Sequence, residues 1–448
     1  MTLVHSATQS FRSVILSAAK HLTARPFASL RVTDLLCQSF VIRFSGSDSM
    51  DTIAPPLASP APIERERVGV RGTRFFIFLL TLFTPACAHP EVDPATVYRS
   101  ASGFGFRVEV VAQKLEIPWA LAFAPDGRIF ITERPGRLRV IENGHLKPEP
   151  VAVVPEVLHL GEGGLMAIAL EPGFTATHRL YLCHTARDAS GAIINRVVRY
   201  REEKGRLTER SVILDHIPGA EFHNGCRVAF GPDGKLYITT GDATARDLAQ
   251  QIDSLAGKIL RLNPDGTVPA DNPFPGSPVY TLGHRNPQGL AWHPGTKTAF
   301  STEHGPSGFD GPAGGDEFNR IQAGKNYGWP VIHHQQIHAG MEAPLLTFTP
   351  AVAPASGTFY AGDRLPEFTN NFFFGAMASQ HLHRIVLAPP DFTTVQSHEA
   401  LLQGVFGRIR DVVAGPDGAL YFTTSNRDGR AQAGPNDDQV LRVVPAGG

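Results

Sequence analysis

A Pro-Asp-Gly turn recurs along this chain, each time after a small apolar segment and before an alternating apolar run that leads into Thr. Three complete copies occupy residues 122–133, 229–240 and 413–424. Pro presets the first turn dihedral, Asp hydrogen-bonds the turn backbone, and Gly accepts a positive φ. Because two short strands flanking such a turn form a hairpin, each copy predicts one antiparallel β-hairpin.

Three further hairpins are expected where the pattern is degraded. Residues 171–173 read Glu-Pro-Gly, residues 293–295 read His-Pro-Gly, and Gly362 precedes an apolar run. The intervals between turns, roughly 47–70 residues, are typical of propeller blades. The sequence therefore predicts an all-β fold, a six-bladed β-propeller of four-stranded antiparallel blades. A β-sandwich with coincidental turns is the alternative, and residues 245–256 are the best short helical segment.

Composition narrows the classes of partner. The chain has 448 residues, of which 42% are hydrophobic, and its formal net charge is −1. This balance, with no basic patch or tail, gives no support for binding nucleic acid or an anionic membrane. The 44 glycines and 36 prolines suit strands joined by tight turns. We therefore expect an ordinary soluble enzyme that is not integral to a membrane.

A secretory signal is expected well inside the chain. Arg71 and Arg74 precede an apolar run at residues 75–83, which is followed by an Ala-x-Ala sequence at residues 86–88. A basic segment, an apolar run too short to span a bilayer and a small-residue cleavage site are typical of a signal peptide. We assign this signal peptide to residues 68–88.

That assignment leaves residues 1–67 outside the mature protein, as a mis-assigned start or a disordered segment. Translation would then begin near Val68 or Val70, and residues 89–448 would form the mature domain in the periplasm or outside the cell. Two alternatives remain, a buried hydrophobic strand and a lipoprotein anchored through Cys87. The Thr-Pro-Ala sequence before Cys87 is a poor lipobox.

Two of the four cysteines, Cys183 and Cys226, belong to the mature domain. One disulfide could join them in an oxidising compartment, but spacing alone does not decide this. The favoured interpretation is two unpaired buried thiols. No Cys-x-x-Cys-His sequence is present, which excludes covalently attached haem.

Four short motifs lie in the segments between the predicted hairpins, where propeller loops converge on one end of the axis. They are His-Asn-Gly at residues 223–225, Gly-His-Arg-Asn-Pro-Gln-Gly-Leu-Ala-Trp at 283–292, Glu-His-Gly-Pro at 303–306 and Arg-Ile-Arg at 408–410. From about residue 112 to residue 444, the chain resembles the soluble pyrroloquinoline quinone (PQQ) dependent sugar dehydrogenases, the glucose/sorbosone dehydrogenase family.

The resemblance implies a periplasmic oxidoreductase that uses PQQ and Ca²⁺. Its substrate would be an aldose, whose anomeric C1 hydroxyl is oxidised to the lactone. Electrons would pass to an external acceptor, a quinone or a cytochrome, and the protein would be a monomer or a homodimer.

By resemblance, His223 is the general base that takes the proton from the anomeric hydroxyl. An imidazole suits this role because its unperturbed pKa is close to operating pH. Arg285 would hold and polarise a quinone oxygen of PQQ, and Asn286 would contact the same edge of the cofactor. A guanidinium can donate two hydrogen bonds to an oxygen on which negative charge develops.

Arg408 and Arg410 alternate along a strand, and alternation sends both side chains to one face. PQQ carries three carboxylates, so the pair is a plausible receptor for them. The alternative is a charged outer strand face. Glu162 occupies a position where relatives often carry a Gln that contacts PQQ, and its carboxylate could repel the anionic cofactor.

The resemblance also implies two calcium sites. Backbone carbonyls of Gly305 and Pro306 would hold the Ca²⁺ that bridges to PQQ. Glu317 and the carbonyl of Tyr327 would bind a second, structural Ca²⁺. Calcium prefers six to eight oxygen ligands, and loop carbonyls are ordinary ones. No EF-hand pattern is present, so residue patterns alone do not reveal either site.

This chain departs from the family pattern at several positions. Ala378 replaces a frequent Lys or Arg, Ala351 replaces a Thr or Ser, and Cys226 stands where a second Gly is expected. Losing a cation and a hydroxyl should weaken the binding of a polyanion, by roughly 1–3 kcal/mol per desolvated contact. Two rival functions follow: a non-catalytic propeller that binds carbohydrate or protein, and a calcium-dependent lactonase.

Overall fold

Each Pro-Asp-Gly turn joins the first two strands of a sheet. The computed structural model describes residues 92–447, so the expectations for residues 1–67 and the signal peptide at 68–88 lie outside the described residues. The three complete copies connect β3 (Pro118–Phe123) to β4 (Ile129–Glu133), β12 (Gly225–Phe230) to β13 (Leu236–Thr240), and β24 (Ile409–Ala414) to β25 (Leu420–Thr424).

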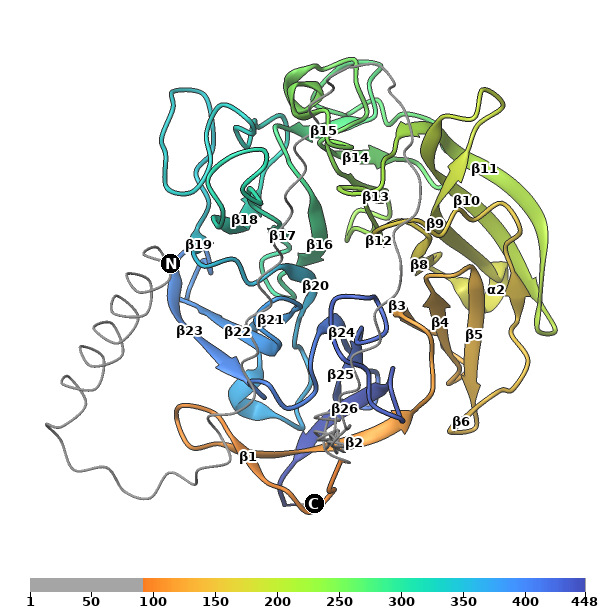
Figure 1. Ribbon diagram of the computed structural model, residues 1–448, viewed down its shortest axis with the longest axis vertical. Coiled ribbons are helices and arrows are strands. Elements are labelled where there is room, and N and C mark those ends of the chain that lie inside the picture. Colours follow the sequence, from red (N-terminus) through yellow and green to blue (C-terminus); the bar gives the residue numbers. More distant parts are fainter. Residues whose placement is uncertain (1–91, 448) are drawn as a thin grey trace, which may run out of the picture. The chain divides into compact units, whose positions relative to one another are not determined.

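The degraded copies occupy the matching positions in three more sheets. They connect β8 (Leu165–Leu170) to β9 (Arg179–Arg187), β16 (Pro287–Trp292) to β17 (Ala299–Glu303), and β20 (Pro354–Phe359) to β21 (Phe372–Ala376). Short helices α2 (Phe174–Thr177) and η3 (Pro366–Phe368) lie in two of these connections. The six sheets surround a common axis (Figure 1), which confirms the six-bladed propeller. We number the blades 1 to 6 by their first strands, β3, β8, β12, β16, β20 and β24.

The outer strands complete each blade in antiparallel order. They are β5 (Arg137–Glu142), β6 (His145–Leu146) and β7 (Ala152–Val153) in blade 1, β10 (Ile193–Glu203) and β11 (Arg206–Pro218) in blade 2, β14 (Lys258–Leu262) and β15 (Val279–Leu282) in blade 3, β18 (Asp316–Ile321) and β19 (Leu346–Phe348) in blade 4, β22 (His381–Leu387) and β23 (Val395–Leu401) in blade 5, and β26 (Val440–Pro445) in blade 6.

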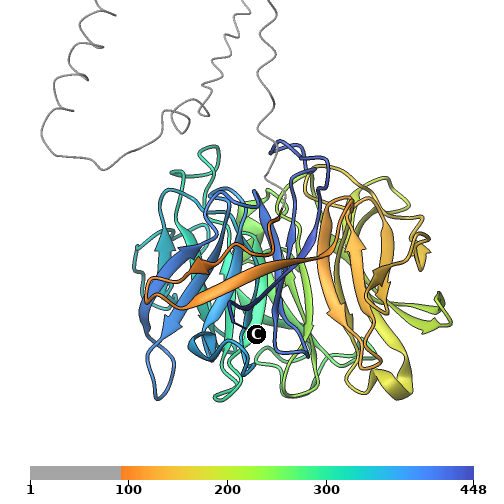
Figure 2. The same cartoon turned by 90° about the horizontal axis from the view of Figure 1, so that it is seen from below.

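A strand from the start of the domain closes the ring. β2 (Gly105–Ala112) pairs antiparallel with β26, with Val108 opposite Val443, and β1 (Tyr98–Arg99) pairs with β2. Figures 1 and 2 show β2 lying along the strands of blade 6. Blade 6 therefore combines both ends of the domain, and the ring closes through backbone hydrogen bonds rather than through packing alone.

The turn aspartates also tie strands together. The Asp233 carboxylate accepts hydrogen bonds from the Tyr237 hydroxyl (3.1 Å) and from Nε of Arg261 (3.0 Å). Asp417 repeats this arrangement in blade 6. Each aspartate thereby joins its turn to the second and third strands of its blade.

The helical segment expected at residues 245–256 is only a short 3₁₀ helix, η2 (Arg246–Gln250). Nζ of the buried Lys258 donates hydrogen bonds to the carbonyls of Leu248, Ala249 and Ala256. These bonds tie the turn of residues 246–256 to β14.

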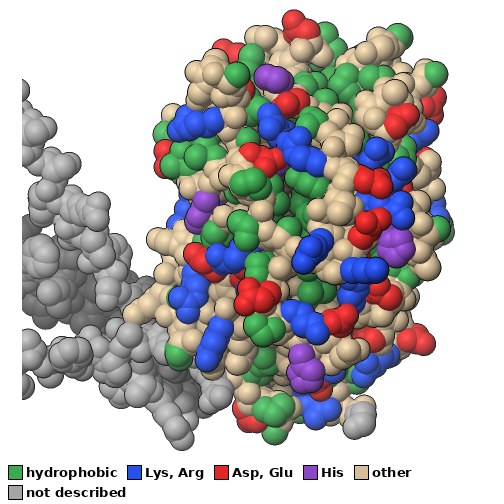
Figure 3. Space-filling model, turned by 90° about the vertical axis from the view of Figure 1, so that its right-hand side faces the viewer, with side chains coloured by type: hydrophobic (Ala, Val, Ile, Leu, Met, Phe, Trp, Pro, Cys, Tyr) green, Lys and Arg blue, Asp and Glu red, His purple; other side chains and the backbone are tan. Residues whose placement is uncertain are grey.

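The outer face of blade 2 carries interspersed basic and acidic side chains (Figure 3). Arg196 pairs with Asp215 at 3.0 Å, and Arg210 pairs with Glu156 at 2.8 Å. Exposed pairs of this kind contribute little to stability. Within residues 92–447, no helix is long and apolar enough to span a membrane.

The expectation of two free thiols is wrong, because Cys183 and Cys226 form a disulfide with Cα atoms 5.8 Å apart. Cys183 lies in β9 of blade 2 and Cys226 in β12 of blade 3, and both are buried. Neighbouring blades bring the two strands together although the cysteines are separated by 43 positions in sequence. Spacing could not show this contact, since it depends on how blades pack.

Removing this disulfide should destabilise the domain. For the sequence separation of 43, the chain-entropy model gives a contribution of about 3–4 kcal/mol. We expect the Cys183→Ala/Cys226→Ala double variant to unfold at lower urea concentration than the oxidised protein. Dithiothreitol should shift the unmodified protein in the same direction and leave the variant unchanged. Superimposable curves for the oxidised protein and the variant would contradict a stabilising disulfide.

Candidate functional site

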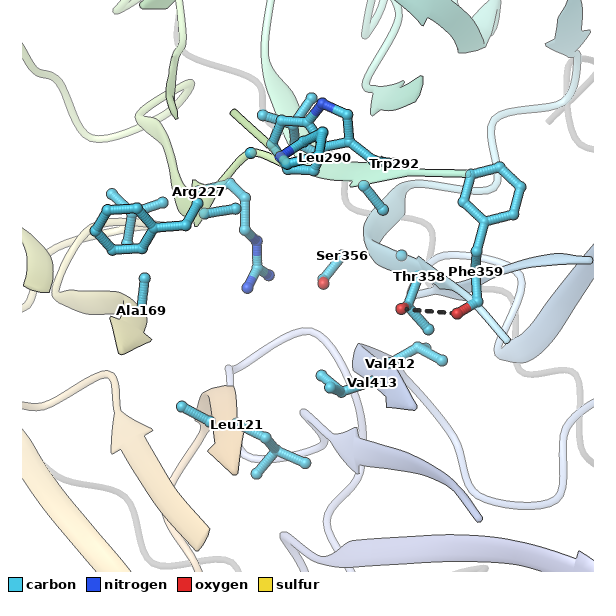
Figure 4. Close-up of a pocket in the computed structure, with 18 of the residues that line it drawn as sticks. Leu121, Ala169, Arg227, Leu290, Trp292, Ser356, Thr358, Phe359, Val412 and Val413 are labelled. Carbon is cyan, nitrogen blue, oxygen red and sulfur yellow. Dashed lines mark hydrogen bonds between the residues drawn. The ribbon is translucent and has the colours of Figure 1, made fainter. Parts of the chain in front are cut away.

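Two hollows lie along the propeller axis, one at each end. The hollow at the hairpin end, about 630 Å³, is lined mainly by apolar side chains around Arg227 (Figure 4). Arg227 is already paired with Asp411 (3.1 Å) and lies over the ring of Trp119. None of the residues expected to carry function lines this hollow.

The opposite hollow, about 530 Å³, brings the sequence motifs together. All six first strands run in the same direction around the axis, so the segments before them meet at one end. Five residues expected to carry a function line this cavity: Glu162, His223, Gly305, Pro306 and Arg408. Ala351 and Ala378, two of the departures from the family pattern, also line it. Arg285, Asn286 and Arg410 are almost fully buried nearby, with 1%, 0% and 4% exposure.

His223 is held by a carboxylate that the sequence analysis missed. Its Nδ1 lies 2.8 Å from Oδ1 of Asp242, and Asp242 Oδ2 accepts a hydrogen bond from Nε1 of Trp329 (2.8 Å). An ionised carboxylate can only accept, so the histidine proton resides on Nδ1 and leaves Nε2 with its lone pair. Asp242 follows the second repeat in Thr-Thr-Gly-Asp, which carries no signal of its own.

The backbone after His223 is unusual. His223, Gly225 and Cys226 have φ values of 60°, 61° and 70°, in the left-handed region. The pairing of β12 with β13 also shifts register between Gly225 and Val228. Cys226 therefore occupies a conformation that favours glycine, which agrees with the glycine expected there, and its disulfide anchors this segment to β9 of blade 2.

Arg285 is enclosed by the loop of residues 304–310. Its Nε lies 2.7 Å from Oδ2 of Asp310, one terminal nitrogen donates to the Ser307 hydroxyl (3.0 Å), and the other donates to the His304 carbonyl (3.2 Å). Burial alone would raise the pKa of the Asp310 carboxyl, but the hydrogen bond from Arg285 brings it below its usual value. The sequence analysis missed Asp310.

Asn286 offers an unused hydrogen-bond donor. Its Oδ1 accepts the backbone N–H of Gly225 (3.0 Å), which connects the Arg-Asn motif to the His-Asn-Gly motif. Its Nδ2 is buried without a hydrogen-bond partner, as is Nε2 of His304. Such unpaired polar groups are costly in an interior, so their presence fits a ligand that accepts hydrogen bonds here.

The two arginines of the Arg-Ile-Arg motif do come together, and Arg134 joins them. Arg408 pairs with Asp428 (2.8 Å) and donates to the Met377 carbonyl, whereas Arg410 has only neutral partners within hydrogen-bond distance. Burial, with Arg134 and Arg408 close by, lowers the pKa of Arg410 to about 9 despite the opposing effect of Asp428. An excess of guanidinium groups over carboxylates makes this cluster a receptor for an anion.

The carboxylate of Glu162 is ionised and its charge is balanced by an ion pair. Its Oε1 lies 3.0 Å from Arg430, and its Oε2 accepts the backbone N–H of His223 (3.2 Å). Burial alone would raise the pKa of Glu162, but His304, Arg430 and that N–H lower it to about 2. The concern that this carboxylate repels an anionic ligand is therefore reduced by Arg430, a residue without a sequence signal.

Backbone oxygens of Gly305 and Pro306 are the donors expected for the first calcium site. Asp316 holds this turn by accepting the Gly305 N–H (2.7 Å), and Pro306 O accepts the N–H of Gly314 (3.0 Å). A Cβ on Gly305 would lie 2.4 Å from backbone atoms of Gly314 and Gly315, so only glycine fits this close approach. Carbonyl and carboxylate oxygens suit a hard cation.

Glu317, which is expected to bind a second calcium ion, lies in β18 of blade 4. Burial, Glu303 and Asp316 raise the pKa of its carboxyl well above the usual value, although a hydrogen bond from Asn319 opposes this. The Oδ1 atom of Asn319 is buried without a partner. Tyr327 is also buried and lies between β18 and β19 of the same blade. Within residues 92–447, no group of three or more His, Cys, Asp and Glu side chains is arranged to hold a metal. Binding would therefore depend on carbonyl and amide oxygens as well.

Comparison with known proteins identifies the family to which this chain belongs. The family model for glucose/sorbosone dehydrogenases matches residues 115–433. The aldose sugar dehydrogenase of Escherichia coli is 33% identical over 361 residues, which cover 75% of this chain and 92% of that protein. This chain belongs to the glucose/sorbosone dehydrogenase family.

Two solved structures share the fold over nearly their whole length. A putative oxidoreductase (glucose dehydrogenase) from Thermus thermophilus is 45% identical, with a TM-score of 0.70, covering 76% of this chain and 100% of that one. The PQQ-bound aldose sugar dehydrogenase of Streptomyces coelicolor is 34% identical, with a TM-score of 0.67, covering 76% of this chain and 98% of that one.

Calcium should bind to this domain and stabilise it. A ligand present at 100 times its Kd adds ~2.7 kcal/mol per site, because it binds only the folded state. We expect isothermal titration to give two Ca²⁺ per chain and Glu317→Gln to give one, with a smaller rise in melting temperature. Glu221→Gln, at an exposed carboxylate, is the matched control. Identical melting curves in CaCl₂ and EDTA would count against both sites.

Proposed function

We propose that this chain is a PQQ-dependent aldose sugar dehydrogenase that oxidises the anomeric C1 hydroxyl to the lactone. One observation carries the proposal: a histidine whose Nδ1 is held by Asp242 borders the same cavity as Arg408, which belongs to a cluster of buried arginines. The first arrangement suits proton abstraction, and the second suits an anionic cofactor. Membership of the glucose/sorbosone dehydrogenase family supports both assignments.

The residues present fit PQQ. Arg408, Arg410 and Arg134 would receive its carboxylates, because they carry more positive charge than their neighbours cancel. Arg285 and the unpaired Nδ2 of Asn286 would donate hydrogen bonds to its quinone edge. Carbonyls of the turn at residues 305–306 would hold the Ca²⁺ that lies against it. When bound, PQQ supplies the two-electron acceptor for the hydride that leaves C1.

The chain's own residues handle the proton. Nε2 of His223 accepts the proton of the anomeric hydroxyl, and the carboxylate of Asp242 stabilises the imidazolium that forms. Arg285 would supply positive charge to an oxygen of the bound quinone on which negative charge develops. Asp310 orients this guanidinium through the 2.7 Å contact. In this proposal the His223–Asp242 pair takes up the proton, and the Arg285–Asp310 pair stabilises the negative charge that develops.

We also propose that the protein acts in the periplasm or outside the cell and passes electrons to an external acceptor, a quinone or a cytochrome. The disulfide supports an oxidising compartment. The signal-like segment at residues 68–88 supports export, with the mature chain beginning near residue 89.

His223 and Arg285 should separate kinetically. Changing His223 to Ala removes the base and leaves the cofactor contacts, so PQQ should still bind while kcat falls roughly 10²–10⁴-fold. Changing Arg285 to Ala should lower both PQQ affinity and kcat, and Lys should rescue only partly because it lacks the guanidinium fork. Reconstitution with PQQ and Ca²⁺, followed by assays on an aldose panel with an artificial electron acceptor, measures both quantities.

Three results would redirect the assignment. Wild-type turnover in His223→Ala would remove this residue from the base role. Failure of PQQ to bind at all would favour a non-catalytic propeller, and hydrolysis of a lactone without PQQ would favour a calcium-dependent lactonase.

Asp242→Asn should be almost as damaging as loss of the histidine. An amide can donate its N–H to Nδ1, which moves the histidine proton to Nε2 and removes the lone pair that takes the substrate proton. We expect kcat to fall roughly 10²–10⁴-fold with little change in PQQ affinity. Asp253→Asn, at an exposed site, is the control for the same chemical change. Full activity in Asp242→Asn would show that Asp242 does not position the base.

A further inference from the structure

An exposed aromatic residue lies against the proposed base. Phe309, in the loop between β17 and β18, is 68% exposed and lines the cavity. Its ring stacks on the imidazole of His223, with centroids 5.9 Å apart and planes inclined by 21°. None of the sequence motifs includes this residue, and the cofactor contacts do not use it.

The loop that carries Phe309 is anchored, so the position of the ring is determined by the structure. Asp310 pairs with the buried Arg285 at 2.7 Å, and its other oxygen accepts the Ser307 N–H (2.9 Å). Ser307 also accepts a hydrogen bond from Arg285 (3.0 Å), and Arg246 donates to the Asp310 carbonyl (3.3 Å). These contacts of Ser307 and Asp310 hold the loop backbone on either side of Phe309.

The ring leaves the reactive edge of the histidine accessible. Phe309 lies on the face of the imidazole, and Asp242 occupies Nδ1. Nε2 is the ring nitrogen left free of Asp242, and both His223 and Phe309 line the cavity. Ala351, Met377 and Ala378 are further apolar lining residues.

We propose that Phe309 is a substrate-contacting residue that determines specificity, a wall on which the C–H face of a pyranose packs while its anomeric hydroxyl faces His223. This inference rests on the proposed function, because it assumes an aldose at this cavity. Sugar rings present hydroxyls at their edges and C–H groups on their faces, and aromatic rings bury such apolar faces well. The contact is made equally before and during hydride transfer, so it should affect substrate affinity rather than the chemical step.

Three variants test this inference. Phe309→Ala should raise KM for pyranose aldoses about tenfold with kcat nearly unchanged, which is the pattern for lost uniform binding. Phe309→Trp keeps an aromatic face and should retain a KM close to that of the unmodified protein. Ile337→Ala removes another exposed apolar side chain, 87% exposed and not among the cavity-lining residues, and should change neither constant. PQQ affinity and melting temperature are measured for each variant, since the wall model predicts that both stay the same.

The outcomes separate this inference from the proposed function. An unchanged KM in Phe309→Ala overturns the wall. A lower kcat together with a lower melting temperature also overturns it, because that result indicates a general structural role. If the unmodified chain does not oxidise aldoses, the proposed function fails, and saturation-transfer NMR with glucose on the Ca²⁺-loaded chain still tests the contact. Transfer to the C–H protons that disappears in Phe309→Ala and persists in Ile337→Ala supports the wall. Transfer that is absent, or unaffected by the substitution, rejects it.

Discussion

The common direction of six first strands around one axis is the constraint on which the rest of this structure depends. Each hairpin turn lies at one end of the ring, so the segments that enter the first strands all meet at the other end. His223, Arg285 and Arg408 are far apart in sequence, yet each lies one or two residues before the first strand of its blade. Pairing of β2 with β26 completes the ring and keeps these segments at fixed relative positions.

Within the site, paired side chains hold each candidate functional residue in place. Asp242 holds His223, Asp310 holds Arg285, Asp428 holds Arg408, and Arg430 holds Glu162. A buried polar or charged group without a partner is costly, so each of these candidate site residues is oriented by its partner. His223 is held by a hydrogen bond to a carboxylate, and the others by an opposite charge. Arg410 is the exception, since its contacts within hydrogen-bond distance are neutral. Its charge is not balanced by a carboxylate within hydrogen-bond distance, which is the feature expected of a site that receives an anion.

The repeats predicted the fold because turn chemistry is local: Pro-Asp-Gly specifies a hairpin wherever it occurs. Motif residues such as His223 and Arg408 were identifiable because their flanking sequences are distinctive. Asp242, Arg134 and Phe309 were not, since each acts through a neighbour that only blade packing or loop conformation brings close. The free thiols were predicted wrongly for the same reason: the bond between Cys183 and Cys226 crosses two blades.

The bond between Cys183 and Cys226 restrains the backbone beside the proposed base, and whether it forms depends on the compartment. Cys226 lies three residues after His223, and both residues occupy left-handed backbone conformations. In a reducing environment the disulfide would be absent, and only packing would hold β9 of blade 2 against β12 of blade 3 next to His223. In an oxidising compartment, the covalent bond restrains the same backbone. The segment beside the proposed base is therefore restrained covalently only where conditions allow the disulfide to form.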